Sequence, residues 1–185
     1  MNSTSPSPTV LAFSALWSVG RWHIVAIAAF GLLTFGWIFS GGLYLWWLAA
    51  VCALDWFLVN LLNRVVDLPE DFVNKIPATD WVSRHRKPIL WGGFGLLVGS
   101  LVAVGVFVPA LLPWRLAYHA LGLAYNWPLL PGKRRIKALY FWKNTASATG
   151  FMLTVFGYPL SVVGLLAADV SWLGVALLGL FFFLF

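Results

Sequence analysis

The chain has 185 residues and a net charge of +6, and 61% of it is hydrophobic while only 10% is charged. Together with a mean hydropathy of +0.87, this composition excludes an ordinary soluble domain, which needs far more polar surface. A basic chain can indicate nucleic acid binding, but no segment here is typical of a groove-reading module, so we expect no nucleic acid partner. We expect one integral membrane domain, residues 1–185, held in the lipid bilayer.

Six apolar runs predict an all-α bundle of membrane-spanning helices, because about 20 apolar residues cross the hydrocarbon core of a bilayer. The predicted spans, in chain order, are about residues 23–39, 43–62, 89–108, 115–127, 145–168 and 172–185. A polar loop, residues 64–88, follows the second span, and another follows the fourth and ends near Asn144. Gly157 and Pro159 interrupt the fifth span.

Positive charge is concentrated around these two loops. All of the 12 Lys and Arg residues except Arg115 lie in the loops or before the first span, on one side of the membrane. Cytoplasmic loops carry an excess of Lys and Arg. We therefore expect an integral membrane protein with both loops in the cytoplasm, and we expect the bacterial inner membrane as its location.

The end of the second span carries three side chains that favour a hard cation, Asn63, Asp67 and Asp71. Positions four residues apart share one face of a helix. An amide and two carboxylates suit Mg²⁺, which usually takes one or two carboxylates and completes its shell with phosphate oxygens and water. Pro69 disfavours a helical conformation at Leu68, so a broken turn before Asp71 is the alternative to one continuous stripe.

The two loops combine acids that hold a metal with bases that neutralise phosphate. A diphosphate leaves as a stable anion only if its developing charge is compensated, and Mg²⁺ with Lys and Arg does this electrostatically. The membrane location then favours a substrate with a lipid tail.

Four segments in order resemble the UbiA superfamily of intramembrane prenyltransferases. The Asn-x3-Asp-x3-Asp pattern resembles the family's first aspartate motif, and Lys143-Asn144 resembles the pair that opens its fifth helix. The segment 84–89 resembles the family's Arg-Pro segment, and Tyr125-Asn126-Trp127-Pro128 with Lys133-Arg134 resembles the stretch after its fourth helix. The resemblance covers nearly the whole chain.

The resemblance implies a Mg²⁺-dependent prenyltransferase that moves an isoprenoid from a polyprenyl diphosphate donor to an unidentified acceptor, which can be an aromatic acid, a quinone precursor, a porphyrin or a lipid alcohol. It implies that the Mg²⁺ ligands are Asn63, Asp67 and Asp71, the two aspartates also being catalytic. It implies that the donor diphosphate is bound by Lys133, Arg134, Arg86, Arg64 and Tyr125.

Two departures from the family pattern bear on activity. Many members have an Asp after the motif Asn, where this chain has Arg64. The family also has a second aspartate motif at the end of its sixth helix and nine helices in all, whereas this chain stops inside the sixth run. We therefore expect a domain that is incomplete at its C-terminus, with the last span truncated and with poor catalysis or none.

Asp55 is the third catalytic candidate, because an acid inside a membrane span is costly and is functional by default. It lies eight residues before Asn63 and can position the acceptor or take its proton; the alternative is a buried structural acid paired with His119.

Four alternative interpretations remain open. The loop charges can be a solvated loop with topological cations. The chain can be an inactive half-protein, or a non-enzymatic transporter or assembly subunit whose polar residues line an ion path. A phospholipid-forming phosphotransferase ranks last, because its Asp-Gly-x2-Ala-Arg signature is absent.

Overall fold

The computed structural model describes residues 17, 19–164 and 171–184, and every regular element in this part of the chain is a helix. The prediction of an all-α protein is therefore confirmed. Residues 165–168, predicted to end the fifth span, and Phe185 lie outside the described residues.

Within the described residues, four stretches are long and apolar enough to cross a membrane: α2 (Trp22–Ser40), α3 (Trp46–Val66), α6 (Arg86–Phe107) and the run Trp142–Val163. That run is built from α8 (Tyr140–Phe151), the π-helical η3 (Met152–Gly157) and α9 (Tyr158–Val163). Two predicted spans correspond to shorter helices, α7 (Leu112–Asn126) with 15 residues and α10 (Trp172–Leu184) with 13. The structure thus gives four candidate membrane-spanning helices, and six spans stays a prediction.

The helices begin and end at different residues from those predicted. Helix α3 continues past the predicted end at residue 62 as far as Val66. The first polar loop contains two short helices, α4 (Leu68–Val73) and α5 (Thr79–Arg84), and α6 begins inside the predicted loop at Arg86. The predicted spans ended where polar side chains begin, but the helices continue past those residues. A helix ends where its terminal backbone groups find other hydrogen-bond partners, whatever the polarity of the side chains.

The prolines are accommodated in two ways. Pro113 lies in the first turn of α7, where its missing N–H group is not needed. Pro159 was predicted to interrupt the fifth span, but the helix continues through it because the preceding turn, η3, is a π-helix. The predicted break is therefore a change of helix type.

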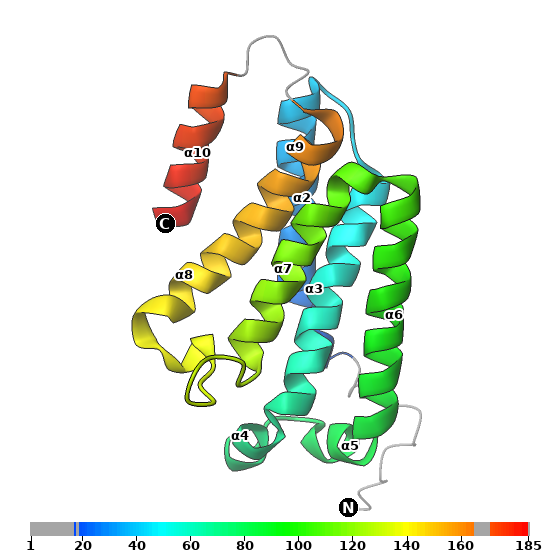
Figure 1. The fold of residues 1–185 in the computed structure, drawn as a ribbon, viewed down its shortest axis with the longest axis vertical. Coiled ribbons are helices and arrows are strands. Elements are labelled where there is room, and N and C mark those ends of the chain that lie inside the picture. Colours follow the sequence, from blue (N-terminus) through cyan, green and yellow to red (C-terminus); the bar gives the residue numbers. More distant parts are fainter. Residues whose placement is uncertain (1–16, 18, 165–170, 185) are drawn as a thin grey trace, which may run out of the picture.

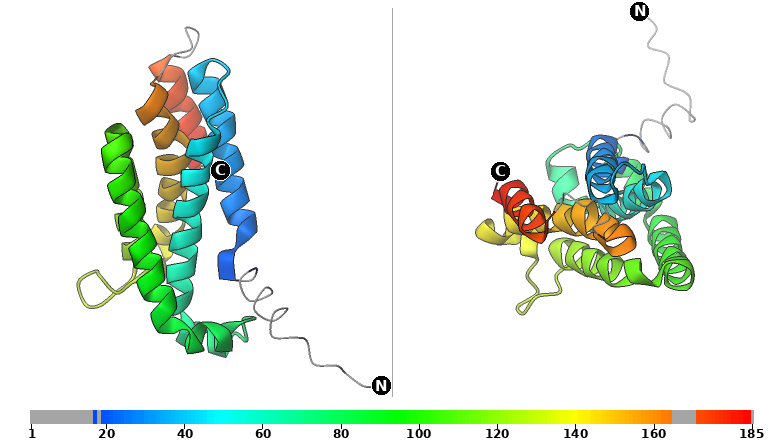
Figure 2. Two further views of the ribbon diagram at one scale, coloured as in Figure 1. Left: turned by 90° about the vertical axis from the view of Figure 1, so that its right-hand side faces the viewer. Right: turned by 90° about the horizontal axis from the view of Figure 1, so that it is seen from above.

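Helix α3 lies between α2 on one side and α6 on the other, as Figures 1 and 2 show. Its buried residues Leu48 and Cys52 belong to one apolar cluster with Leu32 of α2 and with Tyr158 of α9. Helix α7 approaches α3 closely at Gly122, where an added Cβ atom would lie 2.9 Å from the Cγ2 atom of Val59. This close approach brings the ends of α3 and α7 together.

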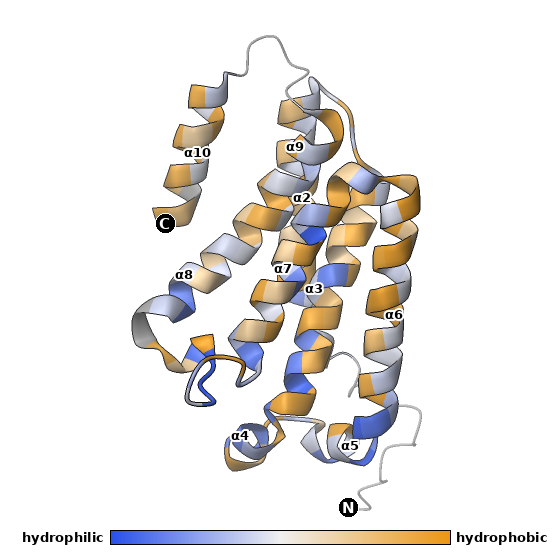
Figure 3. Cartoon of the chain, in the orientation of Figure 1, coloured by the Kyte–Doolittle hydropathy of each residue, from blue (hydrophilic) through white to orange (hydrophobic). Residues whose placement is uncertain are grey.

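Both polar loops lie at the same end of the bundle. Figure 3 shows hydrophilic segments gathered around α4, α5, the start of α6 and the connection between α7 and α8, with another hydrophilic segment inside the bundle on α3 and α7. That connection contains the short helix η2 (Ile136–Ala138). The two loops are therefore placed to share a site.

Candidate functional site

The acidic motif keeps its four-residue spacing across the junction of α3 and α4. The backbone N–H group of Asp67 donates to the Asn63 carbonyl at 2.9 Å, and that of Asp71 donates to the Asp67 carbonyl at 2.8 Å. Pro69 lies in the first turn of α4, where it removes no needed donor. The structure therefore brings Asn63, Asp67 and Asp71 within successive turns, and Pro69 does not separate Asp71 from the other two.

The second polar loop folds across this motif and forms ion pairs with it. Arg135 Nη1 donates to Asp67 Oδ1 at 3.0 Å, and Lys137 Nζ donates to Glu70 Oε2 at 3.1 Å. Arg135 also contacts Glu70, and Lys137 also contacts Asp67. Two cations and two carboxylates, about 65 to 70 residues apart in the sequence, therefore form one cluster.

A polar cavity of about 300 Å³ lies beside this cluster. Its lining includes one acid, one phenol and three cations: Glu70, Tyr125, Arg135, Lys137 and Lys143. The excess of positive charge favours an anion with several oxygens, because Lys and Arg form charge-assisted hydrogen bonds to phosphate. Tyr125, predicted to bind the donor, is thus in the cavity.

Two other predicted phosphate ligands, Lys133 and Arg134, lie outside this cavity. Both are exposed, and neither forms an ion pair with another described residue. A tight turn explains this, because the Leu130 N–H group donates to the Arg134 carbonyl at 3.1 Å and Lys133 has a left-handed φ of 56°. Prediction missed Arg135 and Lys137, although their alternation after a Pro-Gly turn was a usable signal.

Arg64 forms an ion pair with the last residue of the motif, Asp71. Its Nη1 atom donates to Asp71 Oδ2 at 2.5 Å, its Nη2 atom donates to the Pro77 carbonyl at 2.9 Å, and the side chain is buried. Burial raises the pKa of Asp71, and the Arg64 charge opposes that shift. Arg64 therefore gives the Asp71 carboxylate a buried counterion and ties α3 to the link between α4 and α5.

The motif offers oxygen ligands that fit a magnesium ion bound together with phosphate. The Asn63 Oδ1 atom is buried and accepts no hydrogen bond from a described residue. Among the described residues, no three His, Cys, Asp or Glu side chains gather that would hold a metal by themselves. Mg²⁺ commonly takes one or two carboxylates and finds its other ligands in substrate phosphates and water, so Asn63 and Asp67 fit that kind of site.

Asp55 lies in a different setting, at the centre of a buried polar network. Arg115 Nε donates to Asp55 Oδ2 at 2.8 Å, and Arg115 Nη2 contacts the other oxygen. Tyr158 donates to Oδ2 at 2.7 Å, and His119 Nε2 lies 2.9 Å from Oδ1. Both carboxylate oxygens therefore already have partners, which is the arrangement expected of a structural acid paired with His119.

Sequence reasoning missed Arg115 and Tyr158 as members of this network. Arg115 was the one cation outside the basic side of the membrane, and an unpaired Asp in a neighbouring span was the signal that could have identified its partner. Arg115 also donates from Nη1 to the Ser100 carbonyl at 2.8 Å, so the network joins α3, α6, α7 and α9.

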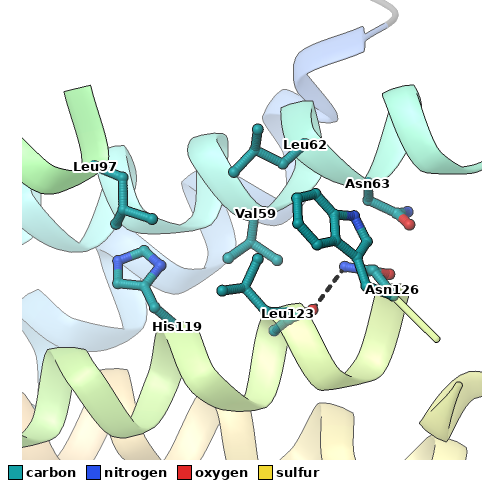
Figure 4. Close-up of a pocket in the computed structure, with 9 residues that line it drawn as sticks. Val59, Leu62, Asn63, Leu97, His119, Leu123 and Asn126 are labelled. Atoms are coloured by element: carbon teal, nitrogen blue, oxygen red, sulfur yellow. Dashed lines mark hydrogen bonds between the residues drawn. The ribbon is translucent and has the colours of Figure 1, made fainter. Parts of the chain in front are cut away.

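A small cavity lies between the Asp55 network and the motif (Figure 4). His119 and Asn63 line it, as does Asn126, whose side-chain Nδ2 atom donates to the Gly122 carbonyl at 3.0 Å. Its volume is about 10 Å³, which is room for about one water molecule. Eight residues of α3 separate Asp55 from Asn63, about 12 Å along the axis. Asp55 therefore lies about two helical turns further into the bundle than the motif.

Arg86, the remaining predicted donor ligand, lines a separate groove with Lys87. The structure therefore does not gather the predicted phosphate ligands in one place. Tyr125 belongs to the cavity beside the motif, whereas Arg86 belongs to a groove between α3 and α6.

We expect Asp55→Asn to destabilise the protein strongly. The substitution leaves Arg115 as a buried cation without its counterion, and breaking such a pair costs about 3–5 kcal/mol. Thermal unfolding in detergent measures the effect. Asp80→Asn is the control, because Asp80 is exposed and its carboxylate forms no ion pair with a described residue. Equal midpoints for the two variants would contradict a structural role for Asp55.

We expect the contribution of Glu70 to stability to disappear in acid. Burial acts to raise the pKa of Glu70, but the hydrogen bonds and charges of Arg135 and Lys137 outweigh it and lower the pKa below the ordinary 4.5. A lowered pKa stabilises the folded state above that ordinary value, and the stabilisation is lost as the pH falls through the folded-state pKa.

The measurement is the difference in thermal midpoint between wild type and Glu70→Gln as a function of pH. The difference corresponds to at most about 1 kcal/mol near neutral pH, because the Glu70 side chain is half exposed. It should shrink as the pH falls through and below 4.5. A difference that stays constant from neutral to acid would mean that Glu70 is not ion-paired in solution.

Comparison with known proteins adds no relative. No family model, no curated protein and no solved structure matches the chain. The functional assignment therefore depends on the motifs and on the geometry of the two loops.

Proposed function

We propose that this chain is an integral membrane prenyltransferase of the UbiA type, which binds an isoprenoid diphosphate with Mg²⁺ at the end of α3. The observation that carries the proposal is the cluster in which Arg135 and Lys137 contact Asp67 and Glu70 beside a basic cavity. Acids and bases from two distant loops meet where an apolar span reaches its polar end. A lipid-tailed diphosphate has the same division between a charged head and an apolar tail.

The ion pairs of the cluster can be exchanged for ligand contacts without leaving a buried charge unpaired. In the absence of ligand, the carboxylates of Asp67 and Glu70 neutralise Arg135 and Lys137. When a metal diphosphate enters, Arg135 and Lys137 can transfer to phosphate oxygens while Asp67 binds the metal. Breaking a partly buried ion pair is costly if one partner stays alone, but Asp67 and both cations gain a new partner, and the half-exposed Glu70 is hydrated.

The roles of the other residues follow from their positions. Asn63 and Asp67 are the first proposed Mg²⁺ ligands, and Asp71 is the third, held ready by Arg64. Lys143 and the Tyr125 hydroxyl face the same cavity and can bind the outer phosphate oxygens. When bound, Mg²⁺ supplies positive charge that favours departure of the diphosphate from the isoprenoid carbon. Lys133 and Arg134, exposed at the tip of the loop, attract the anion from a distance.

In our proposal Asp55 does not contact the substrates and only positions the helices that carry the site. Its oxygens are occupied by Arg115, Tyr158 and His119, so it fixes α3 against α7 and α9. A direct contact with the acceptor would require one of these partners to leave.

We also propose that six spans cross the membrane, with α7 and α10 completing the set, and that the end carrying α4 and α5 faces the cytoplasm. Support comes from the positive-inside rule. Further support comes from the ion pairs between the two loops, which require both loops on one side of the bilayer.

The transporter alternative depends on Asp55 and His119 lining an ion path. The Asp55 side chain has no exposed surface, and the cavity next to His119 has a volume of only about 10 Å³. These observations favour the enzyme over the transporter.

We expect geranylgeranyl diphosphate with Mg²⁺ to stabilise the wild-type protein in detergent, and Asp67→Asn to lose that stabilisation. A ligand at 100 times its Kd stabilises a protein by about 2.7 kcal/mol. Asp80→Asn is the matched control, because it removes the same charge from the same loop outside the cavity. The measurement reports binding, so it holds even if turnover is slow.

Equal ligand-induced shifts in wild type and Asp67→Asn would count against the metal site. A shift of the same size without Mg²⁺ would show that the cations alone bind the diphosphate. The absence of any shift in the wild type would favour the transporter or the half-protein.

A further inference from the structure

A second, larger cavity lies on the outside of the bundle. It is a groove of about 590 Å³ between α3, α6 and the segment that follows α7. Its walls are mainly apolar and aromatic, including Trp91, Phe94, Trp127 and Leu129, and its cations are Arg86 and Lys87. Nothing in the proposed prenyl transfer uses this groove.

The charge in the groove differs from that in the cavity beside the motif. Arg86 and Lys87 are exposed and form no ion pair with a described residue, and no carboxylate lines the groove. In the cavity beside the motif, Glu70 offsets part of the positive charge. The groove therefore favours an anion that needs no metal and carries an apolar portion alongside it.

The position of the groove indicates where that anion comes from. Arg86 and Lys87 begin α6, a candidate membrane span, and the apolar residues of the groove follow within its first turns. Trp and cationic residues gather where lipid headgroups meet the hydrocarbon core, and basic pockets between spans on the cytoplasmic side bind anionic headgroups. The N-terminal end of α6 adds the positive end of a helix dipole.

We propose that this groove binds an anionic phospholipid of the surrounding bilayer. The lipid phosphate lies between Arg86 and Lys87, and an acyl chain lies along Trp91 and Phe94. The occupant is a lipid because one wall of the groove is α6, a candidate membrane span whose first residues are largely exposed, with Trp91 79% exposed.

Binding there would affect the contact between the first half of α6 and the segment that follows α7. Phe94 packs edge-on against Trp127, with ring centroids 5.2 Å apart, and both rings line the groove. A lipid against both rings would hold the end of α7 and the start of the second loop. Arg86, which the family resemblance assigned to the donor diphosphate, is assigned here to the lipid. The proposal does not depend on prenyl transfer.

The test is a titration of the delipidated full chain in detergent with phosphatidylglycerol, followed by native mass spectrometry of the lipid adducts. We expect Arg86→Gln/Lys87→Gln to raise the Kd about thirtyfold, since each Lys or Arg near an anionic lipid contributes about fivefold. The matched control is Arg84→Gln/Lys75→Gln, which removes two exposed cations of the same loop that do not line the groove. It should retain the wild-type Kd.

Trp91→Ala provides a second variant. Trp91 is mainly exposed, so its loss leaves the core intact, and we expect weaker binding of phosphatidylglycerol through the lost acyl contact. Unchanged lipid binding in both groove variants overturns the proposal, as does equal binding of phosphatidylcholine by the wild type.

A competition experiment separates this proposal from the prenyltransferase site. In Asp67→Asn, which lacks the proposed metal ligand, geranylgeranyl diphosphate should leave the phosphatidylglycerol adduct in place. Displacement of the lipid in that variant would show that the groove takes the isoprenoid diphosphate, which overturns the lipid assignment.

Discussion

The buried carboxylate of Asp55 is the constraint on which the rest of the bundle depends. An ionised acid inside an apolar bundle is stable only when it is paired and hydrogen-bonded, and Asp55 is paired with Arg115 and receives a further hydrogen bond from Tyr158. Arg115 in turn contacts the Ser100 carbonyl, so one ion pair fixes α3 against α6, α7 and α9. Apolar packing is not directional and would allow these helices to shift along their axes relative to one another. The directed hydrogen bonds of the network fix their relative positions along the axes. The positions of both polar loops follow from these relative positions.

The two charged centres of the molecule differ in what they can do. At Asp55 every carboxylate oxygen is occupied and the network is enclosed, which suits a fixed structural role. At the end of the bundle the pairs between Asp67, Glu70, Arg135 and Lys137 border a cavity, and Glu70 is half exposed. Water and ligands can reach these pairs, so they are able to exchange partners. A site for a metal diphosphate needs that property, because the ligand brings charges of both signs.

The sequence predicted the class of fold and the four-residue spacing of the acidic motif, but not the cations that contact that motif. Composition and the four-residue spacing sufficed to place Asn63, Asp67 and Asp71 together, because helical periodicity is a local property. Lys133 and Arg134 were chosen by resemblance, yet the turn between Leu130 and Arg134 points the chain so that Arg135 and Lys137 meet the acids. The pairing of Asp55 with Arg115 joins residues 60 apart. Such contacts depend on how helices pack, and periodicity within one segment carries no information about them.

The most direct test compares two double variants of the second loop in binding radiolabelled geranylgeranyl diphosphate with Mg²⁺. Arg135→Gln/Lys137→Gln and Lys133→Gln/Arg134→Gln remove the same charge from adjacent positions, but only the first pair lines the cavity beside Asp67. We expect the first variant to lose most of its affinity, at least about tenfold, which corresponds to about 1.4 kcal/mol, and the second to lose much less. Equal losses, or wild-type affinity in the first variant, would contradict the claim that the ion-paired cluster is the diphosphate site.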